Sequence, residues 1–136
     1  MNFLSLNSDP MVHSVLLWEL LAERTSNQSI AHKEMPTERE HCAFVCSQPY
    51  LTWQIIEVDG TLVGACHITK NHEIGIGILK RHQGKGYGKK AVRMLMDTHP
   101  GALKANINPA NAVSIHLFES LGFQQIQVTY ELPDQP

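Results

Sequence analysis

Apolar residues recur along this chain at two spacings, one typical of helices and the other typical of strands. The helical spacing, together with capping and stop signals, predicts four helices. The first helix carries the apolar positions from Val12 to Leu21, and the second follows a capping box formed by Thr37 and Glu40. The third runs from about Tyr87 to Thr98, and the fourth carries the apolar positions from Val113 to Leu121. Gly122 is expected to end the last helix, because glycine readily takes the left-handed conformation after a helix.

Alternating and β-rich runs predict about six strands. They cover Asn2–Leu6, Thr52–Val58, Thr61–Thr69, Glu73–Leu79, Leu103–Ile107 and the alternating run from Ile126 to Leu132. Asp59 and Gly60 are a strong turn signal, so the second and third strands are expected to pair as a hairpin. This order of elements predicts an α/β domain. The polar stretch Thr25–Pro36, between the first two helices, is expected to be a substrate-side loop.

The fourth predicted strand has one apolar face and one face without side chains. Ile74, Ile76 and Ile78 alternate with Gly75 and Gly77. Successive side chains of a strand point to opposite faces, so the glycine face is bare. We therefore expect another group to approach this face closely.

The segment Gln83–Lys89, which reads QGKGYGK, follows this strand and opens the third predicted helix. Its three glycines allow the backbone to curl, so that N–H groups can converge on an anion at the positive end of the helix dipole. The dinucleotide pattern GxGxxG is excluded because it needs a small residue at Lys89, and the pattern GxxxxGK[ST] lacks both its first glycine and its hydroxyl residue. The segment predicts a phosphate loop of another kind.

Two blocks of the sequence resemble the GCN5-related N-acetyltransferase (GNAT) superfamily. In the first, Gln83, Gly86 and Gly88 are similar to the family motif of Gln or Arg, two residues, Gly, one residue, and Gly or Ala. The second is NPANAVSIHLFESLGF, starting at Asn108, which matches a later family motif at Asn111, Ser114, Leu117, Phe118, Glu119, Gly122 and Phe123. The resemblance implies one N-acetyltransferase domain over residues 1–136. Its sheet would be mixed, mostly antiparallel, and splayed between the fourth and fifth strands.

Length, charge and cysteine content agree with a single cytoplasmic domain. A chain of 136 residues can bury its own core, and its apolar runs are far shorter than the roughly 20 residues that span a bilayer. Cys42, Cys46 and Cys66 lack CxxC spacing, so we expect reduced thiols and no metal site. The net charge of −2 argues against a nucleic-acid partner, but six of the eleven Lys and Arg residues lie between Lys80 and Arg93, which predicts a local anion site.

The resemblance implies acetyl-CoA as the co-substrate. Its pyrophosphate would be held by the glycine loop, at Gln83, Gly84, Gly86, Tyr87, Gly88 and Lys89. Main-chain atoms near Ile78 and Leu79 would pair with pantetheine and polarise the thioester carbonyl. Asn111 would contact the cofactor, cap the following helix, or do both, since a cap uses only its side-chain oxygen. By the same resemblance, Phe118 would lie on the cofactor side, at a position where many family members carry Tyr.

Glu73 is the residue we expect to act as the catalytic base. It alternates along the strand with Gly75 and Gly77, so its side chain is expected on the same face as these glycines. Its position is similar to that of the catalytic glutamate in histone-type relatives. A carboxylate there could take a proton from an ammonium substrate through water. An exposed Glu at a strand edge is the alternative interpretation, and His67 and His72 are alternative bases.

The general acid is less well defined, because Phe118 cannot donate a proton. A departing thiol with a pKa of about 8.5 could be protonated by water. Tyr130, His116 and Tyr50 are the alternative acids in the sequence.

The expected function is transfer of an acetyl group from acetyl-CoA to the primary amine of a small molecule, such as a nucleotide-linked amino sugar. This follows from a diffuse similarity of the N-terminal half to enzymes that acetylate amino sugars or ribosomal protein N-termini. Two alternatives stay open, a protein N-terminal acetyltransferase and a non-catalytic acyl-CoA-binding module. We expect no membrane partner, and a homodimer is one of the assemblies that the sequence leaves open.

Overall fold

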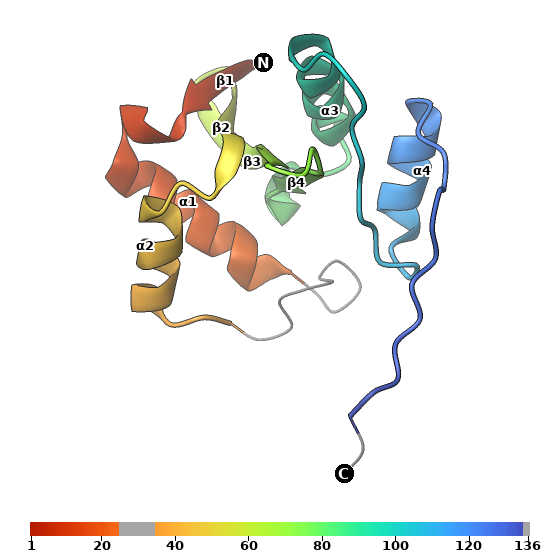
Figure 1. Ribbon diagram of the computed structural model, residues 1–136. Helices are drawn as coiled ribbons and strands as arrows, with labels where there is room; N and C mark the ends of the chain where they lie inside the picture. The colour runs from red at the N-terminus through yellow and green to blue at the C-terminus, as the bar shows by residue number, and fades with distance from the viewer. Residues whose placement is uncertain (25–34, 135–136) are drawn as a thin grey trace.

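The protein is described from a computed structural model that covers residues 1–24 and 35–134. Its elements form three layers (Figure 1). The helices α1 (Pro10–Glu23) and α2 (Glu38–Cys46) lie on one side of a central sheet, and α3 (Tyr87–Thr98) and α4 (Ala112–Ser120) lie on the other. Most of the predicted substrate-side loop falls outside the described residues.

The sheet contains four antiparallel strands in the order β1-β2-β3-β4. Their bounds are Asn2–Ser5, Tyr50–Val58, Thr61–Thr69 and Ile74–Ile78. Two short 3₁₀ helices complete the described elements, η1 at Leu6–Ser8 and η2 at Lys80–His82. The predicted hairpin is confirmed: Asp59 and Gly60 have φ angles of 50° and 80°, the two positive values that a type I′ turn requires.

Each face of the sheet contributes to its own hydrophobic cluster. One cluster joins Leu16 and Leu17 of α1 to Ile55 and Ala65 of the sheet. The other joins Val92 and Leu95 of α3, and Phe118 of α4, to residues that include Ile56, Cys66, Ile68 and Ile74. The two clusters show that the alternation of side chains along β2, β3 and β4 sorts residues between the two helical layers.

The bare face of β4 is covered by side chains of the protein itself. Gly75 pairs with His67 and Gly77 pairs with Ala65 across the β3–β4 ladder. A Cβ atom on Gly75 would collide with the imidazole of His67, and one on Gly77 would stand 3.4 Å from Cδ2 of Leu20 on α1. The expected close approach is therefore made by His67 and Leu20.

Two of the six predicted strands do not form, which corrects the expected strand count. Within the described residues, the segment 103–107 forms no strand, and its strand-type pairing is a single parallel bridge between Lys104 and Glu73, the residue before β4. In that bridge the Ile74 N–H donates to the Lys104 carbonyl over 2.7 Å, and the Lys104 N–H donates to the His72 carbonyl over 2.9 Å. After Lys104 the described chain makes no further strand pairing with β4. The two segments therefore separate, which is the splay expected between the fourth strand and this segment.

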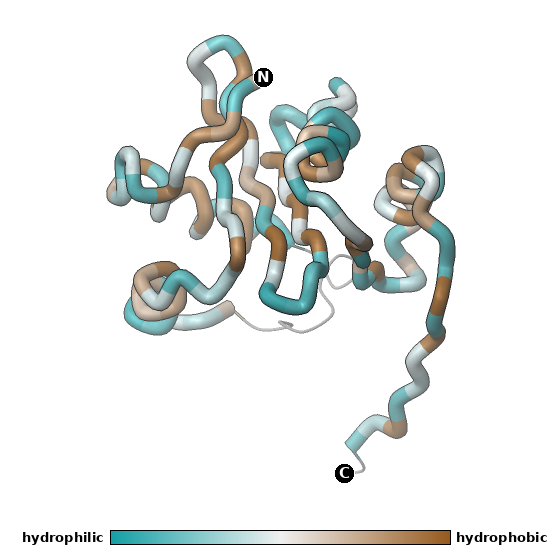
Figure 2. The backbone as a smooth tube through the Cα atoms, turned by 45° about the horizontal axis from the view of Figure 1, so that its top comes forward, coloured by the Kyte–Doolittle hydropathy of each residue, from teal (hydrophilic) through white to brown (hydrophobic). Residues whose placement is uncertain are grey.

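The second missing strand is the alternating run near the C-terminus. Residues 123–134 have no regular structure, and Ile126, Val128, Tyr130 and Leu132 are exposed. Figure 2 shows hydrophobic positions recurring along this segment as it runs away from the body of the protein. Alternation predicts which side chains would share a face, but a strand also needs a neighbouring strand to pair with, and residues 124–132 join no ladder of the described sheet.

None of the helices within residues 1–24 and 35–134 combines sufficient length with sufficient apolar character to cross a bilayer.

Candidate functional site

The glycine loop links η2 to α3 in a conformation that depends on its glycines. Gly84 and Gly86 both have φ angles of 80°, in the left-handed region that side chains disfavour. Gly86 is the N-cap of α3, and the first intrahelical bond runs from the Lys90 N–H to the Gly86 carbonyl over 3.2 Å. The N–H groups of Tyr87, Gly88 and Lys89 precede this bond, so they point out of the helix end as a ready donor set for an anion.

Positive charge surrounds this loop. All six predicted basic residues are exposed, namely Lys80, Arg81, Lys85, Lys89, Lys90 and Arg93. Arg81 is partly neutralised by an ion pair of 3.1 Å with Glu19. The loop therefore presents amide donors and several ammonium groups to the same solvent-exposed region, which suits a ligand that carries phosphate groups.

The outer edge of β4 adjoins the loop and presents main-chain groups in a regular alternation. The Leu79 N–H is directed inward and donates to Val63 over 2.9 Å, whereas the Ile74 N–H is directed outward to Lys104. Residues of even number therefore direct their main-chain groups away from β3, and Ile76 joins Ile78 on this edge. Sequence reasoning missed Ile76, although its shared parity with Ile78 is the signal that could have identified it.

Two groups named from the sequence have partners within the chain. The Ile78 carbonyl accepts a bond of 2.9 Å from Nε2 of Gln83. Leu79 is completely buried, and its N–H is taken by Val63. Gln83 thus ties the end of β4 to the start of the glycine loop, and the Leu79 amide is directed into the sheet.

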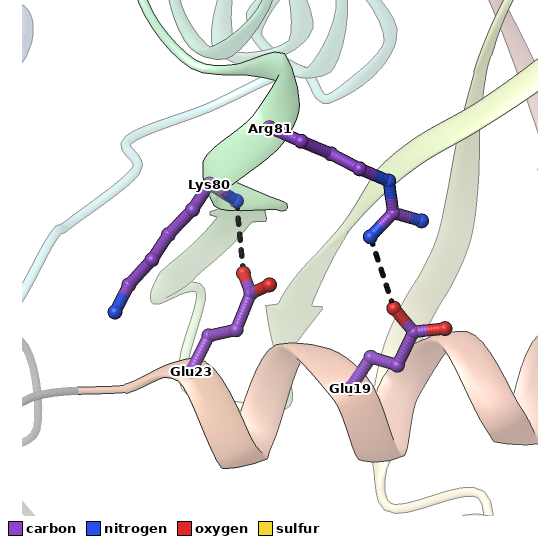
Figure 3. Close-up of polar contacts among 4 residues, drawn as sticks. All are labelled: Glu19, Glu23, Lys80 and Arg81. Atoms are coloured by element: carbon purple, nitrogen blue, oxygen red, sulfur yellow. Dashed lines mark hydrogen bonds and ion pairs between the residues drawn. The ribbon is translucent and has the colours of Figure 1, made fainter.

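The turn before the glycine loop is held by α1 (Figure 3). Oε1 of Glu23 accepts a hydrogen bond of 2.8 Å from the Lys80 N–H. Nη1 of Arg81 donates to Oε2 of Glu19 over 3.1 Å. These contacts could not be predicted from the sequence, since the partners lie 57 and 62 positions apart and a surface Glu on a helix carries no signal of its partner.

Asn111 and Phe118 both have structural roles in α4. Oδ1 of Asn111 caps the helix by accepting a bond of 3.2 Å from the Ser114 N–H, which leaves its amide NH₂ group outside the cap. Phe118 is 4% exposed and packs edge-on against Phe123, with ring centroids 5.1 Å apart. The side chain of Phe118 therefore belongs to the core.

Glu73 lies between the β3–β4 turn and the glycine-containing strand. Its N–H donates to Oγ1 of Thr69 over 3.1 Å, and its carbonyl accepts from the Thr69 N–H over 2.9 Å. The β3–β4 ladder has no bulge. Glu73, Gly75 and Gly77 are therefore alternate residues on the same face of the strand. The Glu73 side chain is half-buried.

An aromatic cluster lies next to Gly75, on the face of the sheet that carries α1 and α2. The Tyr50 ring stacks on His67 with centroids 3.8 Å apart, and Trp53 meets Tyr50 edge-on at 4.7 Å. Phe44 of α2 contacts both Tyr50 and Trp53. Phe44 is 41% exposed and the other three are half-buried. The cluster thus presents flat apolar surface beside β4.

The environment of His67 disfavours its charged form. Burial, and then the positive charge of Arg24, lower the pKa of His67 to about 4. Burial also raises the pKa of Tyr50, against the opposing effect of Arg24. A base works best when its pKa is near the working pH, so His67 is poorly suited to general-base catalysis at neutral pH.

The other alternative residues lie elsewhere. His72 is exposed and shares a contact of 3.1 Å with His99, and the exposed residues Tyr130 and His116 lie on the C-terminal segment and on α4. Although His72 directly precedes Glu73, no hydrogen bond or ion pair within the described residues links any of these three side chains to that of Glu73.

The cysteines differ in their surroundings. Cys66 is buried, which raises the pKa of its thiol to about 12, whereas Cys42 and Cys46 are exposed on α2. His41 is buried and directs Nε2 toward the Ser14 carbonyl at 3.4 Å, so it joins α2 to α1. Within the described ranges, no group of three or more His, Cys, Asp or Glu residues could hold a metal ion.

Solved structures with the same fold include several acetyltransferases. The acetyltransferase yncA from Salmonella typhimurium, described as putative and bound to acetyl-CoA, has a TM-score of 0.65 at 20% identity and covers 90% of this chain and 80% of its own. The ribosomal-protein-alanine N-acetyltransferase from Brucella melitensis has a TM-score of 0.70 at 17% identity, covering 93% and 86%. The aminoglycoside 6′-N-acetyltransferase AAC(6')-IG from Acinetobacter haemolyticus has a TM-score of 0.65 at 16% identity, covering 100% and 99%.

No curated protein sequence matches this chain. The profile of the Acetyltransferase (GNAT) family matches residues 15–123, a range that includes β4, the glycine loop and α4. The chain therefore belongs to the acetyltransferase (GNAT) family.

Proposed function

We propose that this chain transfers the acetyl group of acetyl-CoA directly to the primary amine of a small molecule. The observation that carries the proposal is the glycine loop at the start of α3, placed beside the free edge of β4. The loop offers the amides of Tyr87, Gly88 and Lys89 for a diphosphate, and two of its glycines adopt the left-handed conformation that this curl requires. The adjoining lysines supply positive charge.

The edge of β4 would receive the thioester arm. An amide-containing chain can pair with a strand edge through main-chain bonds. The outward N–H and carbonyl of Ile76 and the N–H of Ile78 are oriented for such pairing, whereas the Ile78 carbonyl already accepts a bond from Gln83. An N–H group on this edge would polarise the thioester carbonyl as negative charge develops on its oxygen. The inward direction of the Leu79 amide moves this role from Leu79 to its neighbours on the outer edge.

Glu73 would act as the base at the end of this edge. Its carboxylate would take a proton from the substrate ammonium through water, and the amine nitrogen would then form a bond to the thioester carbon. The carbon–sulfur bond breaks and coenzyme A leaves as a thiolate. A thiol with a pKa of about 8.5 is a good leaving group, so water can protonate it, and the buried Phe118 need not take part.

Direct transfer also agrees with the protonated thiol of the buried Cys66. A covalent acetyl-enzyme would need a thiolate, and burial keeps the Cys66 thiol protonated.

The acceptor that we favour is an amino sugar attached to a nucleotide. Phe44, Tyr50 and Trp53 offer partly exposed flat surface near β4, against which the apolar face of a sugar ring could pack. Arg24 carries positive charge close enough to act on both Tyr50 and His67, and a nucleotide diphosphate would complement it. Other small amines that lack an anionic group would make fewer of these contacts.

A non-catalytic acyl-CoA-binding module is the competing function, and the burial of Phe118 in the core favours it. Thiol release from acetyl-CoA, measured with nucleotide-linked amino sugars, free amino sugars, polyamines and N-terminal peptides, separates the two. An enzyme should release thiol only when a suitable amine is present. A module should bind coenzyme A in calorimetry and release no thiol with any amine, and that result would overturn the proposal.

A further inference from the structure

The 3₁₀ helix η2 begins without a capping group of its own. Its N-cap is Leu79, which is completely buried in the core and makes no side-chain cap bond. The donor at this helix start, the Lys80 N–H, is instead satisfied by Oε1 of Glu23, which belongs to α1 and lies 57 positions earlier. Because Leu79 is needed in the core, the cap has to come from another element.

The two acids on α1 make different kinds of contact with η2 (Figure 3). Glu19 meets the side chain of Arg81, and these side chains are 42% and 58% exposed. Exposed ion pairs of this kind contribute at most about 1 kcal/mol. Glu23 bonds to the main chain, so it acts on the position of the backbone. The Glu23 bond, although also at the surface, therefore holds the backbone of the turn directly, whereas Glu19 contacts only a side chain.

Hydrogen bonds connect η2 to the start of the glycine loop. The His82 N–H donates to the Leu79 carbonyl over 2.8 Å, and the Gln83 N–H donates to the Lys80 carbonyl over 3.2 Å. Gln83 then returns to the Ile78 carbonyl through its side chain. These bonds make one tight turn from Leu79 to Gln83, and Gly84 follows immediately. A shift at Lys80 would therefore move the loop that leads into α3.

We propose that Glu23 is a positioning residue that holds the glycine loop in its coenzyme A-binding conformation. The inference rests on the proposed function, since it assumes that the loop binds the cofactor. The charge of Glu23 alone would act against it, because a carboxylate near this region repels a diphosphate. Loss of the charge and loss of the hydrogen bond should therefore change affinity in opposite directions.

Three substitutions separate these effects. Glu23→Gln keeps an acceptor oxygen and removes the charge, so coenzyme A should bind as tightly as in the wild type or more tightly. Glu23→Ala removes both, and Glu23→Asp keeps the charge but shortens the reach. For these two we expect the Kd for coenzyme A to rise by about three- to tenfold, as for the loss of one such bond. Glu19→Ala is the matched control and should change the Kd by less than about twofold.

Calorimetry with coenzyme A gives the Kd, and steady-state kinetics with acetyl-CoA gives KM and kcat. A positioning role raises the KM of Glu23→Ala and leaves kcat within about twofold. Amide hydrogen exchange over Lys80–Gln83 should accelerate in Glu23→Ala and Glu23→Asp, and not in Glu23→Gln. Thermal unfolding checks that each variant is folded. If Glu23→Ala does not fold, the Kd and the hydrogen exchange of Glu23→Asp decide the question.

Two results would overturn the inference while leaving the proposed function intact. One is a wild-type Kd in Glu23→Ala and Glu23→Asp. The other is tighter binding in both Glu23→Ala and Glu23→Gln, which would show that charge alone matters. Failure of the wild type to bind coenzyme A would overturn the proposed function and this inference with it.

Discussion

The imidazole of His67 lies over Gly75 on the neighbouring strand, in the space that a side chain at position 75 would occupy. The ring also stacks on Tyr50, whose plane is tilted by only 4° from that of His67. Gly75 is thus required by the packing of His67, and the bare face of β4 is an internal packing surface at this point.

Gly75→Ala should destabilise the fold, whereas Gly77→Ala should be nearly neutral. The new methyl group at position 75 would displace the His67 ring and disturb its stacking on Tyr50, at a cost of about 1–3 kcal/mol. At position 77 the methyl group would meet Leu20 at 3.4 Å, an ordinary van der Waals distance. Urea unfolding of both variants measures the difference. Equal stabilities would contradict the packing of His67 over Gly75.

The stability of the protein should fall in mild acid because of His67. Its pKa in the folded state is about 4, below the usual 6.5, so the unfolded state binds this proton more readily. The contribution is complete above pH 6.5 and is lost as the pH falls toward 4, by roughly 2–3 kcal/mol.

The control for this prediction is His67→Phe, which keeps a ring over Gly75 but cannot titrate. The free energy of unfolding of the wild type and of His67→Phe should diverge between pH 6.5 and pH 4. Parallel curves over that range would show that His67 has an ordinary pKa.

Gly86→Val should weaken coenzyme A binding at least about tenfold, because a β-branched residue strongly disfavours a φ angle of 80° and would unwind the loop. Gly60→Val is the matched control, since Gly60 has the same φ angle and an equally open surrounding but lies in the β2–β3 hairpin. Calorimetry should show wild-type affinity for folded Gly60→Val. Similar losses in both variants would mean that the effect reflects general destabilisation.

Glu73→Gln should reduce kcat by about 100-fold, since general bases typically contribute at least this much, with little change in the affinity for coenzyme A. The measurement is thiol release at saturating acetyl-CoA across a range of pH, with Glu38→Gln on the exposed first turn of α2 as control. Turnover equal to that of the wild type at every pH would remove Glu73 from the mechanism.

Local signals in the sequence predicted the local features of the fold. The capping box is confirmed by reciprocal bonds of 3.1 Å between Thr37 and Glu40, and the hairpin at Asp59 and Gly60 also formed. Both depend on residues within a few positions of one another. The contact between Glu23 and Lys80 could not be predicted, because it depends on how α1 packs against the end of β4.

The strand predictions failed where pairing depends on distant parts of the chain. The run from Ile126 to Leu132 has the alternation of a half-buried strand, yet Tyr130 is 92% exposed. Alternation describes one strand alone, and the free energy of a sheet comes from contacts between strands. Ile78 and Leu79 were named together at the end of β4, and their opposite main-chain directions become visible only from the β3–β4 register.

Gly88 differs from the other two glycines of its loop. It lies inside α3 with ordinary helical backbone, and a methyl group there would stand only 3.3 Å from Cδ1 of Leu117 on α4 and 3.9 Å from Cγ1 of Ile78. Gly84 and Gly86 are required for their backbone torsion angles, whereas Gly88 is favoured on steric grounds, because a side chain there would press on Leu117 where α3 packs against α4. One short motif therefore contributes both to the bend of a loop and to the packing of two helices.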